Sequence, residues 1–198
     1  MRKIQITRYN CSWPKTYKKE EKKLRAILQK EISFIAHIGS TAIPSLKAKP
    51  IVDILIGVKN IKEVNSYNQL LIKAGYVPKG AFGVKNRRFF IKYNKSKRLV
   101  HLHVFKNNNP ETIRHLLFKE FLIYHSNEKK EYENLKVRLA KRYPFNIDAY
   151  VEGKKKLIKT IDQKASAWAS RMLLAKKYSF FSGAIGFRLG LLRNKQPS

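Results

Sequence analysis

One short segment, residues 37–53, holds the densest group of side chains that could do chemistry. It reads HIGSTAIPSLKAKPIVD, so a Gly39-Ser40 pair follows an apolar, partly β-branched stretch. A glycine there lets the backbone approach an oxyanion, and free amides together with the hydroxyls of Ser40 and Thr41 can hold phosphate oxygens. Lys49 would add a neutralising charge. The segment therefore predicts a site for a phosphate group.

Asp53 lies within the next apolar run, residues 51–58. A carboxylate on a buried strand beside a phosphate site is suited to Mg²⁺, which prefers hard oxygen ligands. Phosphate cradle, cation and carboxylate together predict a nucleotide site. A structural interpretation is also open, because Gly-Ser is a common loop dipeptide and Asp53 could be a hydrogen-bonded carboxylate that fixes the loop.

Two histidines, His101 and His103, lie two residues apart in an apolar stretch, so on a strand they would point to the same face. With His37 they could form an imidazole cluster for general acid–base catalysis, for phosphate contact or for a softer metal ion. Strand histidines are also often structural. Of Arg87 and Arg88, which are neighbours, only one can face such a site, and we take Arg88 as the phosphate-binding one.

The hydrophobic pattern along the chain predicts the elements that must position these residues. Apolar residues at helical spacing predict helices, and short β-branched or alternating stretches predict strands. Helices are predicted at residues 17–30, 61–74, 111–124, 128–142 and about 146–169, and strands at residues 34–38, 51–58, 76–78, 88–93 and 99–105, with a weaker strand at 4–7. This order indicates an α+β (α/β) domain with a C-terminal helical part.

The same pattern predicts a single domain over residues 1–169, with a sheet core to about residue 106 and a helical part at about 110–169. Three helical residues are expected to be solvated or to pack, not to bind a ligand: Tyr132, Lys136 and Tyr150. Residues 170–198 form a basic, apolar, glycine-bearing extension. That extension could lie on a membrane, dock on another subunit of a homo-oligomer, or be loosely ordered.

Composition indicates an anionic partner. Lys and Arg total 43 against 13 Asp and Glu, so the formal net charge is +30. Such a field favours nucleotides, nucleic acid or a membrane surface, although a lysine-rich proteome would give the same composition. Cys11 is the only cysteine, which excludes an intrachain disulfide and a thiolate zinc cluster. No stretch approaches the ~20 apolar residues of a transmembrane helix, and we expect a cytoplasmic protein.

Two longer stretches include the residues named above, HIGSTAIP at residues 37–44 and KPIVDIL at 49–55. Further segments accompany them along the chain, namely Trp13-Pro14, Arg87-Arg88-Phe89-Phe90, His101-Leu102-His103-Val104, Leu117-Phe118-Lys119-Glu120-Phe121-Leu122, Tyr132-Glu133-Asn134-Leu135-Lys136 and Tyr150. Over roughly residues 6–161 they closely resemble the signature of the GrpB family, which is grouped with the nucleotidyltransferase-fold (polymerase-β-like) superfamily. The resemblance implies a mixed β-sheet flanked by helices and a site where the Gly39-Ser40 loop faces Asp53.

Members of that superfamily use a Gly-Ser pair, an Asp-x-Asp or Asp-x-Glu strand and a third carboxylate to hold two Mg²⁺ ions. Attack of a hydroxyl on the α-phosphate of a nucleoside triphosphate then releases pyrophosphate. This sequence departs from the pattern, because Leu55 stands two after Asp53, residues 101–103 carry no acid, and Ser45 stands where the GrpB pattern usually has glycine. Either another carboxylate supplies ligands, for which we expect Glu120, or the two-metal reaction does not occur.

Three functions follow from these observations. The first is a nucleotidyltransferase-type enzyme that moves a nucleotidyl or phosphoryl group from a nucleoside triphosphate to an unknown acceptor, with Asp53 as the Mg²⁺ ligand and His101 or His103 as base. The second is a non-catalytic module that binds a nucleotide or another phosphate-bearing ligand. The third is a basic RNA-binding protein, which only electrostatics supports, because the sequence has no recognisable RNA-binding motif.

Overall fold

The structure, a computed structural model, describes the backbone of residues 3–182 and the side chains of residues 3–173. Most of the predicted C-terminal extension, residues 183–198, therefore lies outside the described residues. The helices are α1 (Ser12–Leu28), α2 (Asn68–Lys73), α3 (Pro110–Tyr124), α4 (Ser126–Arg142) and α5 (Ile147–Ser182), and the strands are β1 (Ile32–Ile38), β2 (Val52–Val58), β3 (Tyr76–Pro78), β4 (Arg87–Asn94) and β5 (Lys97–Lys106). No helix within the described part is long and apolar enough to cross a membrane.

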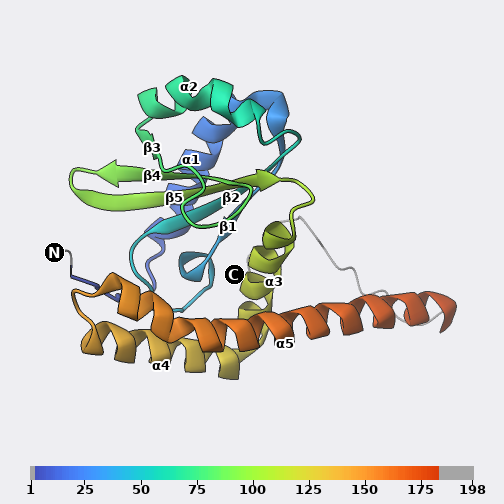
Figure 1. Ribbon diagram of the computed structural model, residues 1–198. Helices are drawn as coiled ribbons and strands as arrows, with labels where there is room; N and C mark the ends of the chain where they lie inside the picture. Colours follow the sequence, from blue (N-terminus) through green and yellow to red (C-terminus); the bar gives the residue numbers. More distant parts are fainter. Residues whose placement is uncertain (1–2, 183–198) are drawn as a thin grey trace.

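The strands form one sheet in the order β1-β2-β5-β4-β3. The pair β2 and β5 is parallel, whereas the other neighbouring pairs are antiparallel. The prediction of a mixed sheet flanked by helices in an α+β fold is therefore confirmed (Figure 1). The weak strand predicted at residues 4–7 is wrong, because Thr7 makes only an isolated bridge with Ala48.

Helices cover both faces of the sheet, with α1 and α2 on one side and α3, α4 and α5 on the other (Figure 1). Strand β2 is nearly all apolar, as expected for a central strand that is buried on both faces. Leu24 and Leu28 of α1 pack against one face of the sheet. On the other face, Leu116 of α3 packs against Leu55 and Phe105.

The three C-terminal helices form a second apolar cluster. Phe118, Phe121 and Leu122 of α3 are buried in it. Ile43 and Leu46, from the loop that follows β1, are fully buried in the same cluster. The loop that carries Gly39 and Ser40 is thereby anchored to the helical part.

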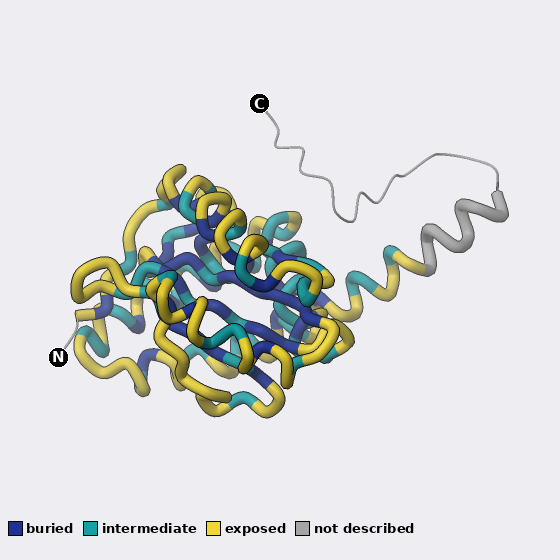
Figure 2. The backbone as a smooth tube through the Cα atoms, turned by 90° about the horizontal axis from the view of Figure 1, so that it is seen from above, coloured by how far each residue is buried: buried dark blue, intermediate teal, exposed yellow. Residues whose placement is uncertain are grey.

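Three predicted helix boundaries are wrong. Helix α1 begins at Ser12, five residues earlier than predicted, because the Asn10 side chain accepts from the Ser12 amide and Pro14 is tolerated in a first turn. The helix predicted at 61–74 is a 3₁₀ segment, Glu63–Tyr67, followed by the short α2. Val, Asn and Ser in that segment are weak helix formers. Helix α5 continues past residue 169 to Ser182 and extends away from the body of the molecule (Figure 2).

Ser45 has a φ of 65°, in the left-handed region that favours glycine. We expect Ser45→Gly to raise the free energy of unfolding by about 0.5–1 kcal/mol, because a Cβ is strained in this conformation. Urea denaturation measures the change. Ser166→Gly, in regular helix α5, is the control and should lower stability by about 0.5 kcal/mol. A loss in both variants would contradict the strain at Ser45.

Candidate functional site: a lysine-lined cavity beside Asp53

The loop after β1 approaches Asp53 closely. Gly39 has a φ of 70°, and a Cβ placed there would lie 2.5 Å from the Asp53 Oδ2 atom. A short 3₁₀ turn, Ser40–Ala42, follows directly. Because both the conformation and the space require glycine, the loop and the carboxylate face each other with no side chain between them. The Gly39-Ser40 pair therefore lies opposite Asp53, where the sequence predicted it.

Thr41 and His37 hold this turn in place. The Thr41 hydroxyl donates to the Ile51 carbonyl oxygen (3.2 Å) and lies 3.0 Å from the His37 Nε2 atom. The His37 ring stacks on Tyr17 of α1, on the sheet face away from Asp53. Burial lowers the pKa of His37 to about 4, so the ring is neutral near pH 7. The structure thus separates His37 from the other two predicted histidines.

Asp53 is paired with the two histidines of β5. In the parallel register Asp53 is the partner of His101, and side-chain alternation puts His103 on the same face. The Asp53 Oδ1 atom lies 3.2 Å from His101 Nδ1 and 3.6 Å from His103 Nε2. Burial alone would raise the pKa of Asp53, but the two imidazoles hold it well below its usual range. Asp53 is therefore a carboxylate at neutral pH.

A cavity of about 230 Å³ opens beside this group, between the loop and the helical part. Its lining comprises Gly39, Ser40, Thr41, Ala48, Lys49, Ile51, Asp53, His101, Tyr132, Lys136, Tyr150 and Lys154. The lining includes three lysines and a single carboxylate, that of Asp53. The cavity is therefore suited to an anion with several negative charges.

Lys136 of α4 is only 2% exposed, which corrects the prediction of a solvated residue. Its Nζ atom donates to Ser40 Oγ (3.1 Å) and to the Lys47 carbonyl oxygen (2.5 Å). The ammonium also lies 4.7 Å from the centre of the Tyr132 ring. Burial, with help from Lys154, lowers the pKa of Lys136 to about 7. The ammonium of Lys136 therefore loses its proton more easily than that of an exposed lysine, and a bound anion would favour the protonated form.

The other two lysines meet at Tyr150. The Nζ atoms of Lys49 and Lys154 lie 5.0 and 4.5 Å from the centre of the Tyr150 ring. Burial and the neighbouring Lys49 lower the pKa of Lys154 to about 8. Tyr132 and Tyr150 are buried as predicted, but they also line the cavity, and the lysine ammonium groups lie over their rings. An anionic ligand would relieve the repulsion between these ammonium groups.

Three other predicted residues, His103, Arg88 and Glu120, do not line the cavity. The Arg88 guanidinium donates to the Asn65 side chain (2.8 Å), on the sheet face opposite the histidines. Its neighbour Arg87 is the arginine that points to the histidine face, where Nη1 lies 3.4 Å from His103 Nδ1. Glu120 on α3 pairs with Lys119 (2.8 Å) and does not line the cavity.

Only one group of the described side chains could hold a metal ion, and it consists of Asp53, His101 and His103. Their potential ligand atoms lie within 4.8 Å of one another. One carboxylate and two imidazoles do not match the two-Mg²⁺ centre that the superfamily resemblance implies, because Mg²⁺ requires oxygen ligands in near-octahedral geometry. These three residues therefore do not supply a two-Mg²⁺ centre.

Gly39→Ala is expected to destabilise the protein by about 2–4 kcal/mol, because the added Cβ must displace the Asp53 carboxylate as well as adopt a positive φ. Gly83→Ala is a matched control, since Gly83 also has a positive φ (79°) but has no atom within 4 Å of the added Cβ. That variant should lose only about 1 kcal/mol. Urea denaturation of both proteins measures the difference, and equal losses would contradict the close approach.

Comparison with known proteins identifies the family of this chain. Residues 3–164 match the family described as GrpB protein. The chain belongs to the GrpB family. A similar relative is the UPF0157 protein YqkA of Bacillus subtilis (strain 168), which is 41% identical over 167 residues, covering 84% of this chain and 48% of YqkA. The GrpB chain therefore spans about half the length of YqkA.

Other GrpB proteins match over more of their own length. The glutamate-rich protein GrpB of Alkalihalophilus pseudofirmus is 31% identical over 79% of this chain and 92% of that protein. The crystal structure of conserved protein GrpB from Enterococcus faecalis has a TM-score of 0.78 and 34% identity, covering 83% of this chain and 99% of that chain. A cytoplasmic RNA terminal U-transferase is much more distant, with a TM-score of 0.48 and 15% identity over 68% of this chain and 41% of that chain.

The sequence did contain a signal for the two missed lysines of this GrpB protein. Tyr132 and Lys136 are four residues apart, and so are Tyr150 and Lys154. On a helix this spacing puts the ammonium over the ring, which is the contact observed in both pairs. Two such pairs, one on each of two successive predicted helices, indicate that each lysine lies over a buried aromatic ring. The local sequence does not show, however, that both pairs lie beside the Gly39 loop.

Proposed function

We propose that the cavity binds a nucleoside triphosphate or another phosphate-bearing ligand. The observation that carries this proposal is the convergence of Lys49, Lys136 and Lys154 on one cavity beside the Gly39-Ser40 loop. Burying cations without a counter-charge is costly, and a site that holds two lysines of lowered pKa gains most from a multivalent anion. At about 230 Å³ the cavity is smaller than the ~300–1,000 Å³ usual for whole drug-sized ligands, so the phosphate end enters it.

The reaction class that we propose is transfer of a nucleotidyl or phosphoryl group from the triphosphate to an unknown acceptor. Family membership and the placement of the Gly-Ser turn opposite Asp53 support it. Lysines that line the cavity would stabilise the charge that develops on the transferring and leaving phosphates. Their contribution requires the protonated form, which ligand binding itself favours.

A non-catalytic binding module is the second candidate, and the carboxylate count favours it. Asp53 is the single acid among the residues that line the cavity, and Glu120 lies elsewhere. The cavity therefore offers too few carboxylate oxygens for the two-Mg²⁺ centre. Such a module would bind the same ligands as the enzyme but would return them unchanged.

A third candidate is RNA binding, supported by a separate basic groove. A cavity of about 550 Å³ is lined by Lys47, Asn134, Val137, Arg138, Lys141 and Arg142. Its four cations suit a sugar–phosphate backbone, and Lys47 also lies close to the first cavity, where its carbonyl accepts from Lys136. RNA binding by this groove would weaken steeply as salt increases.

Calorimetric titration with ATP, CTP, GTP and UTP tests ligand binding, in Mg²⁺ and in EDTA. Saturable binding that Lys154→Met abolishes supports the proposal. Lys155→Met is the matched control, because Lys155 is the next residue, is exposed and pairs with Glu152. No binding of any of the four nucleotides or of inorganic triphosphate would refute the proposal.

Product analysis then separates the first two candidates. Each nucleotide is incubated with the protein, alone and with cell extract as the source of acceptor. Release of pyrophosphate or phosphate that depends on Lys154 supports group transfer. Binding without any product supports the non-catalytic module.

A further inference from the structure

Arg87 contacts the histidine pair from the side opposite Asp53. Its Nη1 atom lies 3.4 Å from His103 Nδ1. A guanidinium is only a donor, so Nδ1 of His103 must be the acceptor. A neutral imidazole carries one proton, which is then on Nε2, the nitrogen that faces the Asp53 Oδ1 atom at 3.6 Å. Arg87 thus selects the His103 tautomer that directs an N–H group to the carboxylate.

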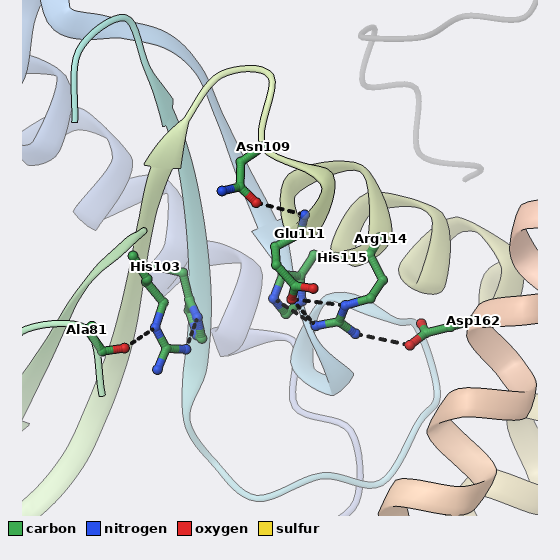
Figure 3. A network of polar contacts seen from close by, with 8 residues as sticks. Ala81, His103, Asn109, Glu111, Arg114, His115 and Asp162 are labelled. Carbon is green, nitrogen blue, oxygen red and sulfur yellow. Dashed lines mark hydrogen bonds and ion pairs between the residues drawn. The ribbon is translucent and has the colours of Figure 1, made fainter. Parts of the chain in front are cut away.

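Arg87 has little freedom to turn away from this position. Its Nε atom donates to the Ala81 carbonyl oxygen (3.1 Å) and its Nη2 atom to that of Phe82 (2.7 Å). The guanidinium also stacks 4.6 Å from the centre of the Phe89 ring, and the residue is buried. Figure 3 shows the contacts that join Ala81 and His103 through this guanidinium, with His115 of α3 nearby.

His101 also directs a protonated nitrogen to Asp53, but through its Nδ1 atom. Its Nδ1 atom lies 3.2 Å from Asp53 Oδ1, and a carboxylate is only an acceptor, so Nδ1 carries the proton. The other nitrogen, Nε2, is buried and has no hydrogen-bond partner. Both imidazole nitrogens that face Asp53 therefore carry protons instead of lone pairs.

A metal ion shared by Asp53, His101 and His103 would have to reverse this arrangement. The two nitrogens that face Asp53 would become ligands, and their protons would move to the far nitrogens. The proton on His103 would then point at Arg87, and the proton on His101 would be buried without an acceptor. Histidines that bind metals almost always donate their second N–H to an acceptor, so the surroundings here oppose ligation.

We propose that Arg87 is a positioning residue that keeps His103 in the Nε2–H tautomer, so that two imidazole N–H groups, and not a divalent cation, stabilise the Asp53 carboxylate. The ligand is then held by the lysines without Mg²⁺; this last clause alone rests on the proposed function. The cavity would then hold its ligand with the lysine ammonium groups, while the imidazole N–H groups serve the Asp53 carboxylate.

Nitrogen-15 NMR of the histidine rings tests the tautomer directly. We expect His103 of the native protein to show an unprotonated Nδ1 and a protonated Nε2 between pH 7 and 8. Arg87→Met should shift His103 towards the other tautomer, whereas Arg87→Lys, which retains a donor, should keep the native one. A protonated Nδ1 in the native protein would overturn the proposal, and this measurement needs no variant to fold.

Titration with Zn²⁺, Mn²⁺ and Mg²⁺ alone tests the metal. The native protein should bind each of them only weakly, without one-to-one saturation at a site that Asp53→Asn removes. Arg87→Met should bind Zn²⁺ at least about tenfold more tightly than the native protein, the scale on which outer-shell groups act. Arg88→Met, on the opposite sheet face, is the control and should gain nothing. Stoichiometric binding to the native protein that Asp53→Asn abolishes would overturn the proposal.

These two measurements use no phosphate ligand, so they stand if the proposed function fails. Calorimetric titration with ATP in EDTA tests separately whether the lysines hold the ligand without Mg²⁺. An affinity for ATP in EDTA within about twofold of the affinity in Mg²⁺ supports this, and binding that requires Mg²⁺ would overturn it.

Discussion

Replacing Lys136 by methionine is expected to weaken binding of ATP or inorganic triphosphate by at least about 30-fold. Removing one member of a buried, hydrogen-bonded charge pair typically costs 2–5 kcal/mol, and Lys136 is the most buried of the three cavity lysines. Ser40 would also lose the donor that orients its hydroxyl. Calorimetric titration measures the loss, and an affinity within threefold of the native value would contradict the role of Lys136.

The same substitution should leave the thermal midpoint unchanged or raise it. The pKa of Lys136 in the folded protein is about 7, below its ordinary value of 10.5, so the folded state disfavours the proton. Between these two pKa values the unfolded chain binds more protons, and the contribution of Lys136 to stability therefore rises with pH. Methionine removes the burial of a charge. A residue that costs stability and yet supports binding is expected at a functional site.

Binding should also depend on pH with a defined sign. The lysines attract an anion only when they are protonated, so affinity should fall as pH rises through about 7 for Lys136 and about 8 for Lys154. Titrations in buffers of different ionisation enthalpy should show proton uptake on binding at pH 8. The Lys155→Met control should keep this uptake, whereas Lys136→Met should lose part of it. Affinity that increases with pH would contradict the assignment.

Replacing Glu20 by alanine is expected to destabilise the protein by about 3–5 kcal/mol. Glu20 is 3% exposed and accepts from Tyr76 (2.8 Å), Lys92 (2.6 Å) and Lys23 (3.2 Å). It joins α1 to strands β3 and β4. Removal of the carboxylate leaves the ammonium of Lys92 buried without its partner, which is the costly way to break a buried ion pair. Urea denaturation at pH 7 measures the change.

Two comparisons make this result specific. The double variant Glu20→Leu, Lys92→Met should recover much of the loss, because apolar residues of similar size often replace a buried ion pair at little cost. Glu152→Gln breaks an exposed pair with Lys155 and should have almost no effect. Equal effects of Glu20→Ala and Glu152→Gln would contradict the account.

The pH dependence of stability follows from Glu20 as well. Its hydrogen bonds to Lys92 and Tyr76 outweigh burial and lower its pKa in the folded protein. A lowered folded-state pKa contributes stability above the unfolded value of about 4.3, and that stability is lost as pH falls. Acid titration of the native protein should therefore show a larger loss of stability below pH 5 than titration of the double variant.

Local sequence determined the half of the site that the sheet contributes. A glycine and a serine after an apolar stretch, an acid within the next one, and two histidines at a spacing of two define positions on strands and at a strand end. Short-range geometry is sufficient for these, because the period of a strand fixes which side chains share a face. His101 and His103 consequently lie together beside Asp53.

The sequence alone did not show which of the two neighbouring arginines lies on the histidine face of the sheet. Arg87 and Arg88 point to opposite faces of β4, and the register with β5 decides which of them lies on the same face as His103. That register depends on pairing between strands and on the turn before β4, where Arg87 meets the Ala81 and Phe82 carbonyl oxygens. For this reason the sequence did not show that Arg87, and not Arg88, lies on the histidine face.

The helical half of the site was decided by the tertiary structure alone. Lys136 and Ser40 are 96 residues apart in the sequence and are joined by a hydrogen bond. The sequence near either residue does not indicate this contact. Ile43 and Leu46 bury themselves among α3, α4 and α5, and this packing brings the glycine loop against helices that could otherwise be read as solvated. Sequence periodicity shows which face of a helix is apolar, but only packing between distant segments shows which charged side chains end at a common cavity.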